Sequence, residues 1–382
     1  MGKPEIRFKG YTDEWEQRKF GDLVEKYEDP VVTPTEGYTR LGIRSHAKGT
    51  FHSYVEKGKE LETAKMFRVA SDKFIVNITF GWEHAVAITD ENDAGKLVSH
   101  RFPQYSFNAG MIPKFFRYLI LDKKFKHHLE LSSPGGAGRN RVLKLSDMLE
   151  YKMNFPCEEE QRKIAAYFDD LDNLITLHQR KCDEVKSLKK YMLQKMFPQN
   201  EQKVPEIRFE GFTEAWEQRK LGDVAQEFKS GNSLKADEID ITGDYPVYGG
   251  NGLRGYTSTY NHDGEYALIG RQGALCGNMN YSAGKAYFTE HAVVVKADEN
   301  NVTRFLYYML DTMNLGQYSD QSAQPGLAVN KLVKLENSFP KKEEQQQIGA
   351  YFRSLDHLIT LHQQKCEELK KIKKFMLQKM FV

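Results

Sequence analysis

The chain contains two blocks of sequence, each of which occurs twice. The first block reads PEIRFKGYTDEWEQRKFGDL at residues 4–23 and PEIRFEGFTEAWEQRKLGDV at residues 205–224, with 14 of 20 aligned positions identical. The second block, at residues 155–197 and 339–381, is identical at 29 of 43 positions. The stretches between the blocks do not repeat. A duplicated frame with two different inserts therefore predicts a pseudo-twofold molecule that recognises two different things.

Composition places the chain among globular proteins. Its 382 residues are 40% apolar, enough for each insert of roughly 110 to 130 residues to bury a core. No run of about 20 apolar residues and no signal-peptide core occurs, so we expect a cytoplasmic protein without membrane contact. The cysteines, Cys157, Cys182, Cys276 and Cys366, lack C-x-x-C spacing and should be reduced thiols. The net charge of +2 decides nothing, because a basic face can lie opposite an acidic one.

Each copy of the second block predicts one long helix. The first copy has no internal Gly or Pro from Glu159 onward, and Pro156 and Pro198 bracket it. Its apolar positions advance by alternating steps of four and three, a coiled-coil period that breaks at Lys189, where Leu188 can substitute. At ~1.5 Å per residue each helix would span roughly 55 to 60 Å and could act as a ruler. The expected seam residues are Ile164, Phe168, Leu171, Ile175, Val185, Ile348, Phe352, Leu355, Ile359 and Leu369.

Two histidines, His178 and His362, fall on the predicted seam at the same place in the two copies. If the helices run antiparallel, these side chains meet near the pseudo-twofold axis. We expect a packed, hydrogen-bonded pair rather than a metal site, because no third ligand repeats nearby.

Both inserts predict an α+β fold. The first, about residues 24–150, combines short β-rich runs with the helical stretch PKFFRYLILDKKFKHHLEL. The second, about residues 225–336, has strands around YPVYGG, EYALIG and AVVVKAD and a helix at TRFLYYMLDTMN. A Glu-His pair precedes an apolar strand in each insert, at Glu83–His84 and at Glu290–His291, and this recurrence favours a scaffold role over chemistry. We therefore expect one fold with diverged surfaces.

Gly-rich loops carry the candidate ligand-binding residues. Gly250, Gly252 and Gly255 match G-x-G-x-x-G, but turn-rich text follows where a dinucleotide site needs a helix, so we expect a tight loop there and a second loop at 271–273. Arg can donate two hydrogen bonds to guanine, Asn and Gln can pair with adenine, and glycines let the backbone approach phosphate. Each residue alone could equally be ordinary surface; their clustering supports the group. The candidate DNA-binding residues are Arg40, Arg44, His46, Lys48, Arg139, Asn140, Arg141, Asn251, Arg254, Tyr256, Arg271, Gln272 and Gln324.

The repeated openings, the helices EEQRKIAAYFDDLDNLITLHQ and EEQQQIGAYFRSLDHLITLHQ, and the loops PVYGGNGLRGY and IGRQGALCGN resemble the specificity subunits of type I restriction-modification systems. The resemblance covers essentially the whole chain. It implies two similar globular target-recognition domains joined by two long antiparallel coiled-coil helices. We divide the chain into a conserved segment with the first recognition domain (1–154), a central helix and linker (155–204), the repeated segment with the second recognition domain (205–338), and a C-terminal helix (339–382).

The resemblance also implies a function and partners. Each recognition domain would read one half of a split, asymmetric site in double-stranded DNA, in the prokaryotic cytoplasm. Two modification (methyltransferase) subunits and the ATP-dependent restriction subunits would bind the same chain. Because the chain lacks an Asp/Asn-Pro-Pro-aromatic motif, a Walker A lysine loop and a nuclease carboxylate cluster, we expect no catalytic residue, metal or cofactor on it. S-adenosylmethionine, ATP and Mg²⁺ would belong to the partner subunits.

Two other functions stay open at this point. One is a coiled-coil scaffold with two protein-binding heads, since the same loops could bind proteins. The other is a self-sufficient DNA methyltransferase or nuclease, which the missing motifs disfavour. Sequence-specific DNA retention with a steep salt dependence distinguishes the DNA reader from the scaffold, and methylation or cleavage by the purified chain would support the enzyme.

Overall fold

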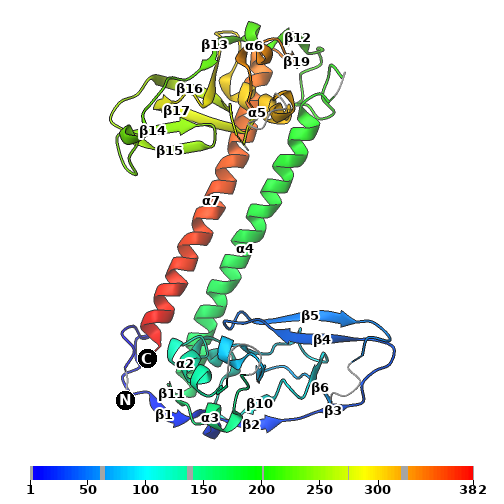
Figure 1. The fold of residues 1–382 in the computed structure, drawn as a ribbon, viewed down its shortest axis with the longest axis vertical. Coiled ribbons are helices and arrows are strands. Elements are labelled where there is room, and N and C mark those ends of the chain that lie inside the picture. The colour runs from blue at the N-terminus through cyan, green and yellow to red at the C-terminus, as the bar shows by residue number, and fades with distance from the viewer. Residues whose placement is uncertain are drawn as a thin grey trace. The chain divides into compact units, whose positions relative to one another are not determined.

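The second repeated block forms two long helices. The computed structural model describes residues 3–60, 65–135, 141–199, 202–273, 275–319 and 326–381. Helices α4 (Glu158–Met196) and α7 (Lys342–Met380) contain 39 residues each (Figure 1). Both have glutamates in the first turn and a lysine in the last, which suits the helix dipole. The prediction of one long helix per block is confirmed.

The chain packs into two compact units. Unit 1 comprises residues up to Leu177 together with residues from Lys365 onward, and unit 2 comprises His178–Gln364. Each unit therefore contains one half of α4 and one half of α7. The four-segment division of the chain and the use of the helices as a ruler stay predictions.

Within each unit the two helices run antiparallel. In unit 1, Lys373 of α7 pairs with Asp172 of α4, and the thiol of Cys366 lies 3.9 Å from the carbonyl oxygen of Ile175. Rising residue numbers on one helix thus meet falling numbers on the other. The equivalent contacts of unit 2 join Lys189 to Asp356 and Cys182 to Ile359.

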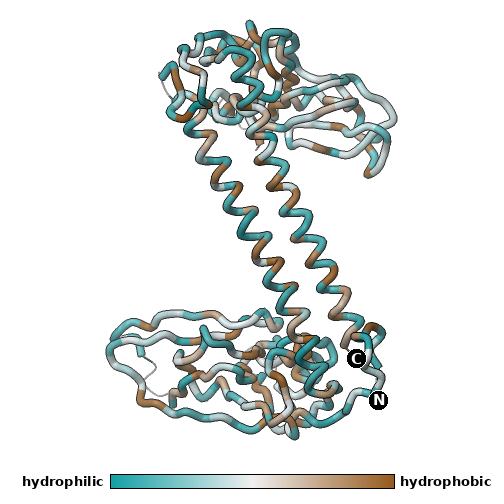
Figure 2. The backbone as a smooth tube through the Cα atoms, turned by 180° about the vertical axis from the view of Figure 1, so that it is seen from behind, coloured by the Kyte–Doolittle hydropathy of each residue, from teal (hydrophilic) through white to brown (hydrophobic). Residues whose placement is uncertain are grey.

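The predicted seam residues lie toward the helix partner and the cores of the units. Figure 2 shows apolar positions recurring between polar ones along both helices. Ile164, Phe168, Ile348 and Phe352 are at most 1% exposed. These residues are also part of the insert cores. In each unit the beginning of one helix and the end of the other pack against the insert. Leu171, Leu355 and Leu369 are also buried, and Ile175, Val185 and Ile359 are half-buried.

The prediction that Leu188 replaces Lys189 on the seam is wrong. Leu188 is 44% exposed, whereas Lys189 reaches across to Asp356, with 2.6 Å between Nζ and Oδ1. The ammonium also lies 5.2 Å from the ring centroid of Tyr308. A carboxylate and an aromatic face on the neighbouring elements therefore stabilise a lysine where an apolar residue was expected.

The two seam histidines form the expected pair. Nδ1 of His178 lies 3.0 Å from Nδ1 of His362, and the ring centroids are 5.2 Å apart. Among the described residues no group of three or more His, Cys, Asp or Glu side chains could hold a metal ion. All four cysteines are free thiols, as expected.

The described residues of unit 1 form three sheets and three short α-helices. A two-stranded sheet pairs β1 (Glu16–Lys19) with β11 (Lys152–Phe155). A four-stranded sheet has the order β2-β10-β7-β8, and a five-stranded sheet has the order β3-β6-β9-β4-β5. The bounds are β2 Val24–Tyr27, β3 Pro30–Val31, β4 Tyr38–Ile43, β5 Thr50–Val55, β6 Met66–Arg68, β7 Lys73–Val76, β8 Val86–Ile88, β9 Leu97–Ser99, β10 Gln104–Phe107, α1 Pro113–Leu119, α2 Lys123–Leu131 and α3 Leu145–Leu149.

Unit 2 repeats part of this plan. It pairs β12 (Glu217–Lys220) with β19 (Glu336–Phe339). Its main sheet has six strands in the order β13-β18-β16-β17-β14-β15. The β14–β15 hairpin is therefore part of this sheet, whereas the β4–β5 hairpin of unit 1 belongs to the separate five-stranded sheet. The bounds are β13 Ala225–Ser230, β14 Tyr245–Gly249, β15 Gly252–Thr257, β16 His262–Gly270, β17 Met279–Phe288, β18 Ala292–Ala297, α5 Thr303–Thr312 and α6 Val329–Leu332.

Both units hold their insert with the same contacts. The buried carboxylate of Glu160, in the first turn of α4, accepts two hydrogen bonds of 2.7 Å from the guanidinium of Arg7 in the opening block. The side chain of Gln161 accepts a 3.0 Å hydrogen bond from the backbone of Ile112, just before α1. Unit 2 repeats both contacts, through Arg208 with Glu344 and through Gln345 with Val302 before α5.

Each Glu-His pair precedes a strand, as expected, but the two strands are not equivalent. The pair Glu83–His84 precedes β8, which ends its sheet, whereas Glu290–His291 precedes β18, the second strand of its sheet. The counterpart of β18 is β10, because each leads into the helix that the repeated glutamine anchors. Local sequence likeness therefore does not mark equivalent positions here.

Candidate nucleic-acid interface

The β4–β5 hairpin of unit 1 carries most of the candidate DNA-binding residues of the first insert. Arg40 lies on β4, while Arg44, His46 and Lys48 lie in the turn, and all four side chains are exposed. His46 and Ala47 have positive φ angles of 63° and 49°. Their amides donate 2.8 Å hydrogen bonds to the carbonyl oxygens of Glu83 and His84. The turn is thus fixed to the body of unit 1 while its charged side chains point outward.

In the Glu83–His84 turn that holds the hairpin, His84 is buried and Glu83 is half-buried. Nε2 of His84 donates a 2.8 Å hydrogen bond to the carbonyl oxygen of Ile120. Burial lowers the pKa of His84 to about 4, so the ring is neutral at pH 7. The scaffold role expected for this histidine agrees with its position.

Arg44 and Phe51 form a platform on the hairpin. The guanidinium of Arg44 lies 5.3 Å from the ring centroid of Phe51 and donates a hydrogen bond to the carbonyl oxygen of Thr50. A Cβ at Gly42 would lie 2.3 Å from the Phe51 ring, so a larger residue there would displace the ring from this position. The platform offers a cation with a fixed direction and an aromatic face, both of which suit nucleotides.

A groove of about 370 Å³ runs beside this platform. Its wall carries a guanidinium, a carboxylate and a hydroxyl next to aromatic rings, and the Ser45 hydroxyl donates to the Glu83 carboxylate. Hydrogen-bond donors, acceptors and apolar surface thus lie together, as base-edge recognition requires. The lining of the groove includes Arg40, Ser45, Phe51, Phe80, Glu83 and Phe102.

The remaining candidate of unit 1, Arg141, is half-buried. Its guanidinium lies 5.5 Å from the ring centroid of Trp82, and Nε donates a 3.3 Å hydrogen bond to the carbonyl oxygen of Ser133. These contacts hold Arg141 against unit 1, so its side chain has a structural use. Arg139 and Asn140 lie outside the described residues.

The tight loop predicted for Arg254 and Tyr256 in unit 2 is wrong. Both residues lie on strand β15, and only Asn251 lies in the turn between β14 and β15. Tyr256 exchanges two 2.9 Å backbone hydrogen bonds with Asp240 and is half-buried. A strand, and not a helix, includes the last two glycines of G-x-G-x-x-G and continues beyond them. The segment therefore lacks the helix N-terminus that a dinucleotide-binding site of this type needs, as expected.

The loop at Arg271 and Gln272 follows β16 and contacts the turn before β18. The amide of Arg271 donates a 2.9 Å hydrogen bond to the carbonyl oxygen of His291, and its Nη1 lies 3.4 Å from that of Glu290. Nδ1 of His291 lies 3.2 Å from Oε1 of Gln272. Unlike His84, His291 therefore lies at the candidate surface, which sequence reasoning missed.

Two glycines bring the candidate loops of unit 2 together. A Cβ at Gly270 would lie 2.5 Å from the carbonyl oxygen of Gly250, and one at Gly250 would lie 3.0 Å from that of His291. The turn bearing Asn251 and the loop bearing Arg271 are consequently adjacent. Gln324 lies outside the described residues.

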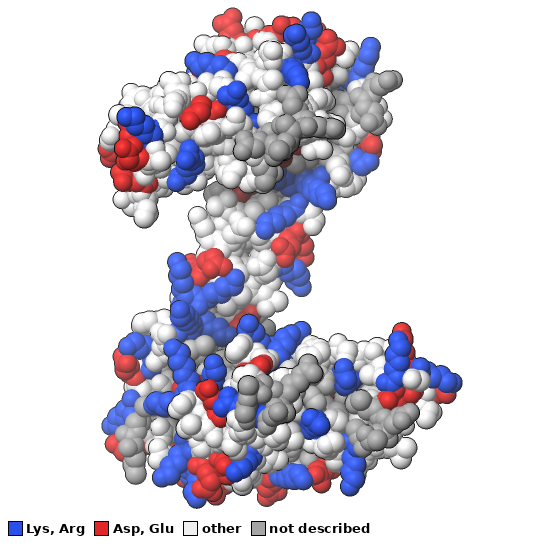
Figure 3. Space-filling model, in the orientation of Figure 1, with Lys and Arg blue, Asp and Glu red and all other residues white. Residues whose placement is uncertain are grey.

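Charge is mixed over the surface that Figure 3 shows, with Lys and Arg gathered over the C-terminal part of α7. A groove of about 700 Å³ lies there, with lysines around an apolar floor. A net charge of +2 therefore coexists with local basic surface. The groove is lined among others by Lys123, Lys124, Lys370, Lys374, Leu377 and Phe381.

Comparison with known proteins identifies similar sequences and folds. The family model described as "Type I restriction modification DNA specificity domain" matches residues 12–187 and 213–371. The EcoprrI specificity subunit of Escherichia coli is 51% identical over 114 residues, which cover 30% of this chain and 28% of that protein. The chain thus matches less than a third of that relative.

Two further proteins match over nearly the whole chain. A putative MjaX specificity subunit of Methanocaldococcus jannaschii is 24% identical over 95% of this chain and 91% of its own length. The crystal structure of the type I restriction-modification S subunit from M. genitalium has a TM-score of 0.69 at 18% identity, covering 100% of this chain and 99% of that one. The described residues include no helix long and apolar enough to cross a membrane.

Proposed function

Because the chain belongs to the family of type I restriction-modification DNA specificity domains, we propose that it is the subunit that reads a split, asymmetric DNA site. One observation carries the proposal: the same frame contacts hold two inserts that present different donors and acceptors. Unit 1 presents Arg40 and Arg44, whereas unit 2 presents Asn251, Arg271 and Gln272. Different sets of this kind select different bases, so each unit reads its own half-site.

The chemistry of the two sets suggests their preferences. A guanidinium such as that of Arg44 donates two hydrogen bonds to the major-groove edge of guanine, and amides such as Asn251 and Gln272 match adenine. Lys48 has no planar fork and suits phosphate, which contributes affinity without selecting a base. Arg254 and Tyr256 remain candidates from a strand position, and Arg139, Asn140 and Gln324 remain candidates from sequence alone.

Partner subunits dock on the long helices in this proposal. Large apolar side chains stay exposed at the same positions of both copies of the helix, for example Leu188 at 44% and Ile372 at 37%. An apolar face that recurs in both units suits two copies of one partner, the modification subunits. Restriction subunits join the same complex. S-adenosylmethionine, ATP and Mg²⁺ bind to these partners, and this chain supplies no catalytic group. The other positions of the face are Leu174, Leu358, Tyr191 and Phe375.

Methylome sequencing of cells that express the chain with its partner subunits tests the DNA proposal. The expected result is methylation within one motif made of two different short halves and a constant gap. Retention of that duplex by the purified complex should fall steeply with salt. Methylation without a split motif, or binding that ignores sequence, would contradict the proposal and favour a protein-binding scaffold.

Charge substitutions test the docking face. Ile372→Glu with Phe375→Glu should release one modification subunit, and Leu188→Glu with Tyr191→Glu should release the other, as measured by the mass of the purified complex. Lys371→Glu is the matched control, because it changes charge at an exposed polar position of α7. Full occupancy in both double variants would move the docking site elsewhere.

A further inference from the structure

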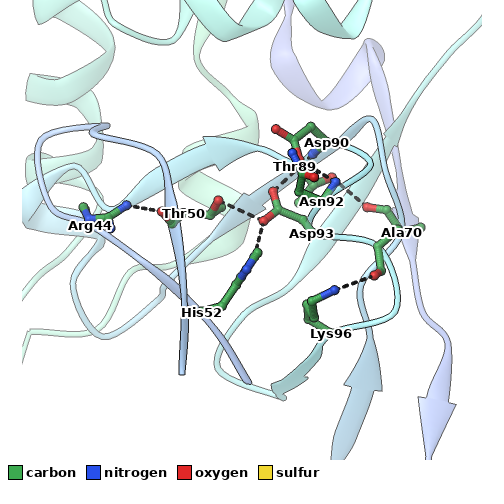
Figure 4. Close-up of polar contacts among 10 residues, drawn as sticks. Arg44, Thr50, His52, Ala70, Thr89, Asp90, Asn92, Asp93 and Lys96 are labelled. Carbon is green, nitrogen blue, oxygen red and sulfur yellow. Dashed lines mark hydrogen bonds and ion pairs between the residues drawn. The ribbon is translucent and has the colours of Figure 1, made fainter. Parts of the chain in front are cut away.

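A buried carboxylate lies behind the β4–β5 hairpin of unit 1, which we call the recognition hairpin. Asp93 follows β8 and precedes β9, and its side chain is only 3% exposed. Its Oδ1 accepts a 2.9 Å hydrogen bond from the Thr50 hydroxyl and lies 2.8 Å from Nε2 of His52, while Oδ2 accepts a 3.1 Å hydrogen bond from the Asp90 amide (Figure 4). A carboxylate buried this deeply is stable only with such partners.

Asp93 holds one face of strand β5. Thr50 and His52 are two positions apart, and side chains with that spacing share a face of a strand. Strand β5 stands last in the order β3-β6-β9-β4-β5, so its ladder joins it to β4. The contacts of Thr50 and His52 with Asp93 therefore tie the outer strand of the hairpin to the loop that connects the two larger sheets of unit 1.

The same stretch of β5 holds Arg44 from its other side. The carbonyl oxygen of Thr50 accepts a hydrogen bond from Nη1 of Arg44, and Phe51, which lies between Thr50 and His52, stacks under the guanidinium. Figure 4 shows the series Arg44, Thr50, Asp93 and His52 linked by polar contacts. A shift of β5 would consequently move both supports of Arg44 at once.

We infer that Asp93 is a positioning residue for DNA recognition in unit 1: it fixes β5 through Thr50 and His52, and thereby the direction of the Arg44 guanidinium toward the first half-site. The inference rests on the proposed function, because it assumes that Arg44 contacts DNA. Asp93 itself touches no base. It acts through pre-organisation, since a guanidinium held in its binding direction loses less freedom when DNA binds.

Unit 2 offers a matched control pair. Nε2 of His262, at the start of β16, lies 2.8 Å from Oε1 of Glu227 on β13, and the imidazole is nearly buried. The candidate loop at Arg271 follows the opposite end of β16. Substitution of Glu227 thus removes a carboxylate from a buried histidine without touching the recognition hairpin of unit 1.

The test is a double-mutant cycle in the complete complex with modification subunits. Asp93→Asn, Arg44→Ala and the double variant are compared on duplexes carrying the methylated motif or a substituted first half. Asp93→Asn should reduce discrimination at the first half-site about tenfold, within the range that one bidentate base contact contributes. The double variant should lose no more than Arg44→Ala alone, discrimination at the second half-site should persist, and Glu227→Gln should leave the first half-site unchanged.

Each outcome bears on a separate claim. Losses that multiply in the double variant, or unchanged discrimination in Asp93→Asn, would overturn the positioning role. A wild-type complex that ignores both half-sites would refute the proposed function instead. If Asp93→Asn unfolds unit 1, His52→Ala removes one contact and leaves the Thr50 hydrogen bond, and it should then give a smaller loss at the same half-site. No loss in a folded His52→Ala complex would also count against the inference.

Discussion

Units 1 and 2 share their frame and differ in what the frame carries. The Arg7–Glu160 pair of unit 1 and the Arg208–Glu344 pair of unit 2 have the same geometry, with nitrogen to oxygen distances of 2.6 to 2.8 Å. The inserts differ: the β4–β5 hairpin of unit 1 lies in a separate five-stranded sheet, whereas the β14–β15 hairpin of unit 2 lies in the main sheet. The attachment of the inserts is therefore the same in both units, while the arrangement of their sheets differs.

The buried ion pairs should show the largest effects on stability. Arg7→Ala leaves the carboxylate of Glu160 buried without its partner, and Arg208→Ala does the same for Glu344. Each change should cost about 3 to 5 kcal/mol of unfolding free energy in its own unit. Urea unfolding followed by Trp15 in unit 1 and Trp216 in unit 2 measures the effect, with the other tryptophans changed to Phe.

A surface pair gives the control for this prediction. Arg162 and Glu158 form an exposed pair one helical turn apart, so Arg162→Ala should change the unfolding free energy by less than about 1 kcal/mol. If only one of the two buried pairs proved important, the frames would not be energetically equivalent.

The stability of unit 1 should depend on pH through His84. The pKa of His84 is about 4 in the folded chain, below its ordinary value of 6.5. Between these pH values the unfolded chain therefore binds more protons than the folded chain. The unfolding free energy of unit 1 should fall by about 3 kcal/mol as the pH falls from 7 to 4. Urea unfolding at several pH values measures this loss. His84→Gln should flatten the pH dependence of unit 1, whereas His291→Gln lies in unit 2 and should leave that dependence intact.

Base-contact variants should have intermediate effects, confined to one half-site. Arg271→Ala or Arg254→Ala should cost about 1 to 3 kcal/mol of binding discrimination if the side chain contacts a base. Competition binding with duplexes that carry single substitutions measures the change. Uniform weakening over all sequences would indicate a phosphate contact instead, and Arg44→Ala provides the comparison at the first half-site.

The smallest stability effects belong to the outer helix face. Leu188→Ala and Ile372→Ala should each change the unfolding free energy of the isolated chain by no more than about 0.5 kcal/mol, because both side chains are substantially exposed. Chemical denaturation of the chain without partners measures this. A loss of several kcal/mol of unfolding free energy in Leu188→Ala would indicate that Leu188 is buried on the seam, and would contradict the observed position of Lys189.

Much of the frame could be predicted from sequence because its signals are local or periodic. The prolines beside the second block, the four-three spacing of Ile164 and Phe168, and the repeated His178 and His362 all identify helix limits and the inward face. The sequence did not predict that Lys189, and not Leu188, lies on the seam. The residues that stabilise Lys189 there, Asp356 and Tyr308, are remote in sequence.

The candidate interface was predictable by residue type more than by geometry. Arg44, His46 and Lys48 are exposed in a turn, in agreement with their glycine-rich and polar surroundings. Arg254 was assigned to a loop although it lies on a strand, because glycines at Gly252 and Gly255 resemble turn residues and sheet pairing overrides that preference. The binding roles of all these residues stay predictions.

The sequence by itself determined the duplication, the length of α4 and α7 and the presence of two unlike inserts, since each of these depends on repeats, periodicity or chain punctuation. Only the tertiary structure decided that Asp93 lies under Thr50 and His52, that Phe51 lies beneath Arg44, and that the backbones at Gly250 and Gly270 meet. The physical reason is that these contacts join segments remote along the chain, and a partner of that kind exists only once the fold has closed.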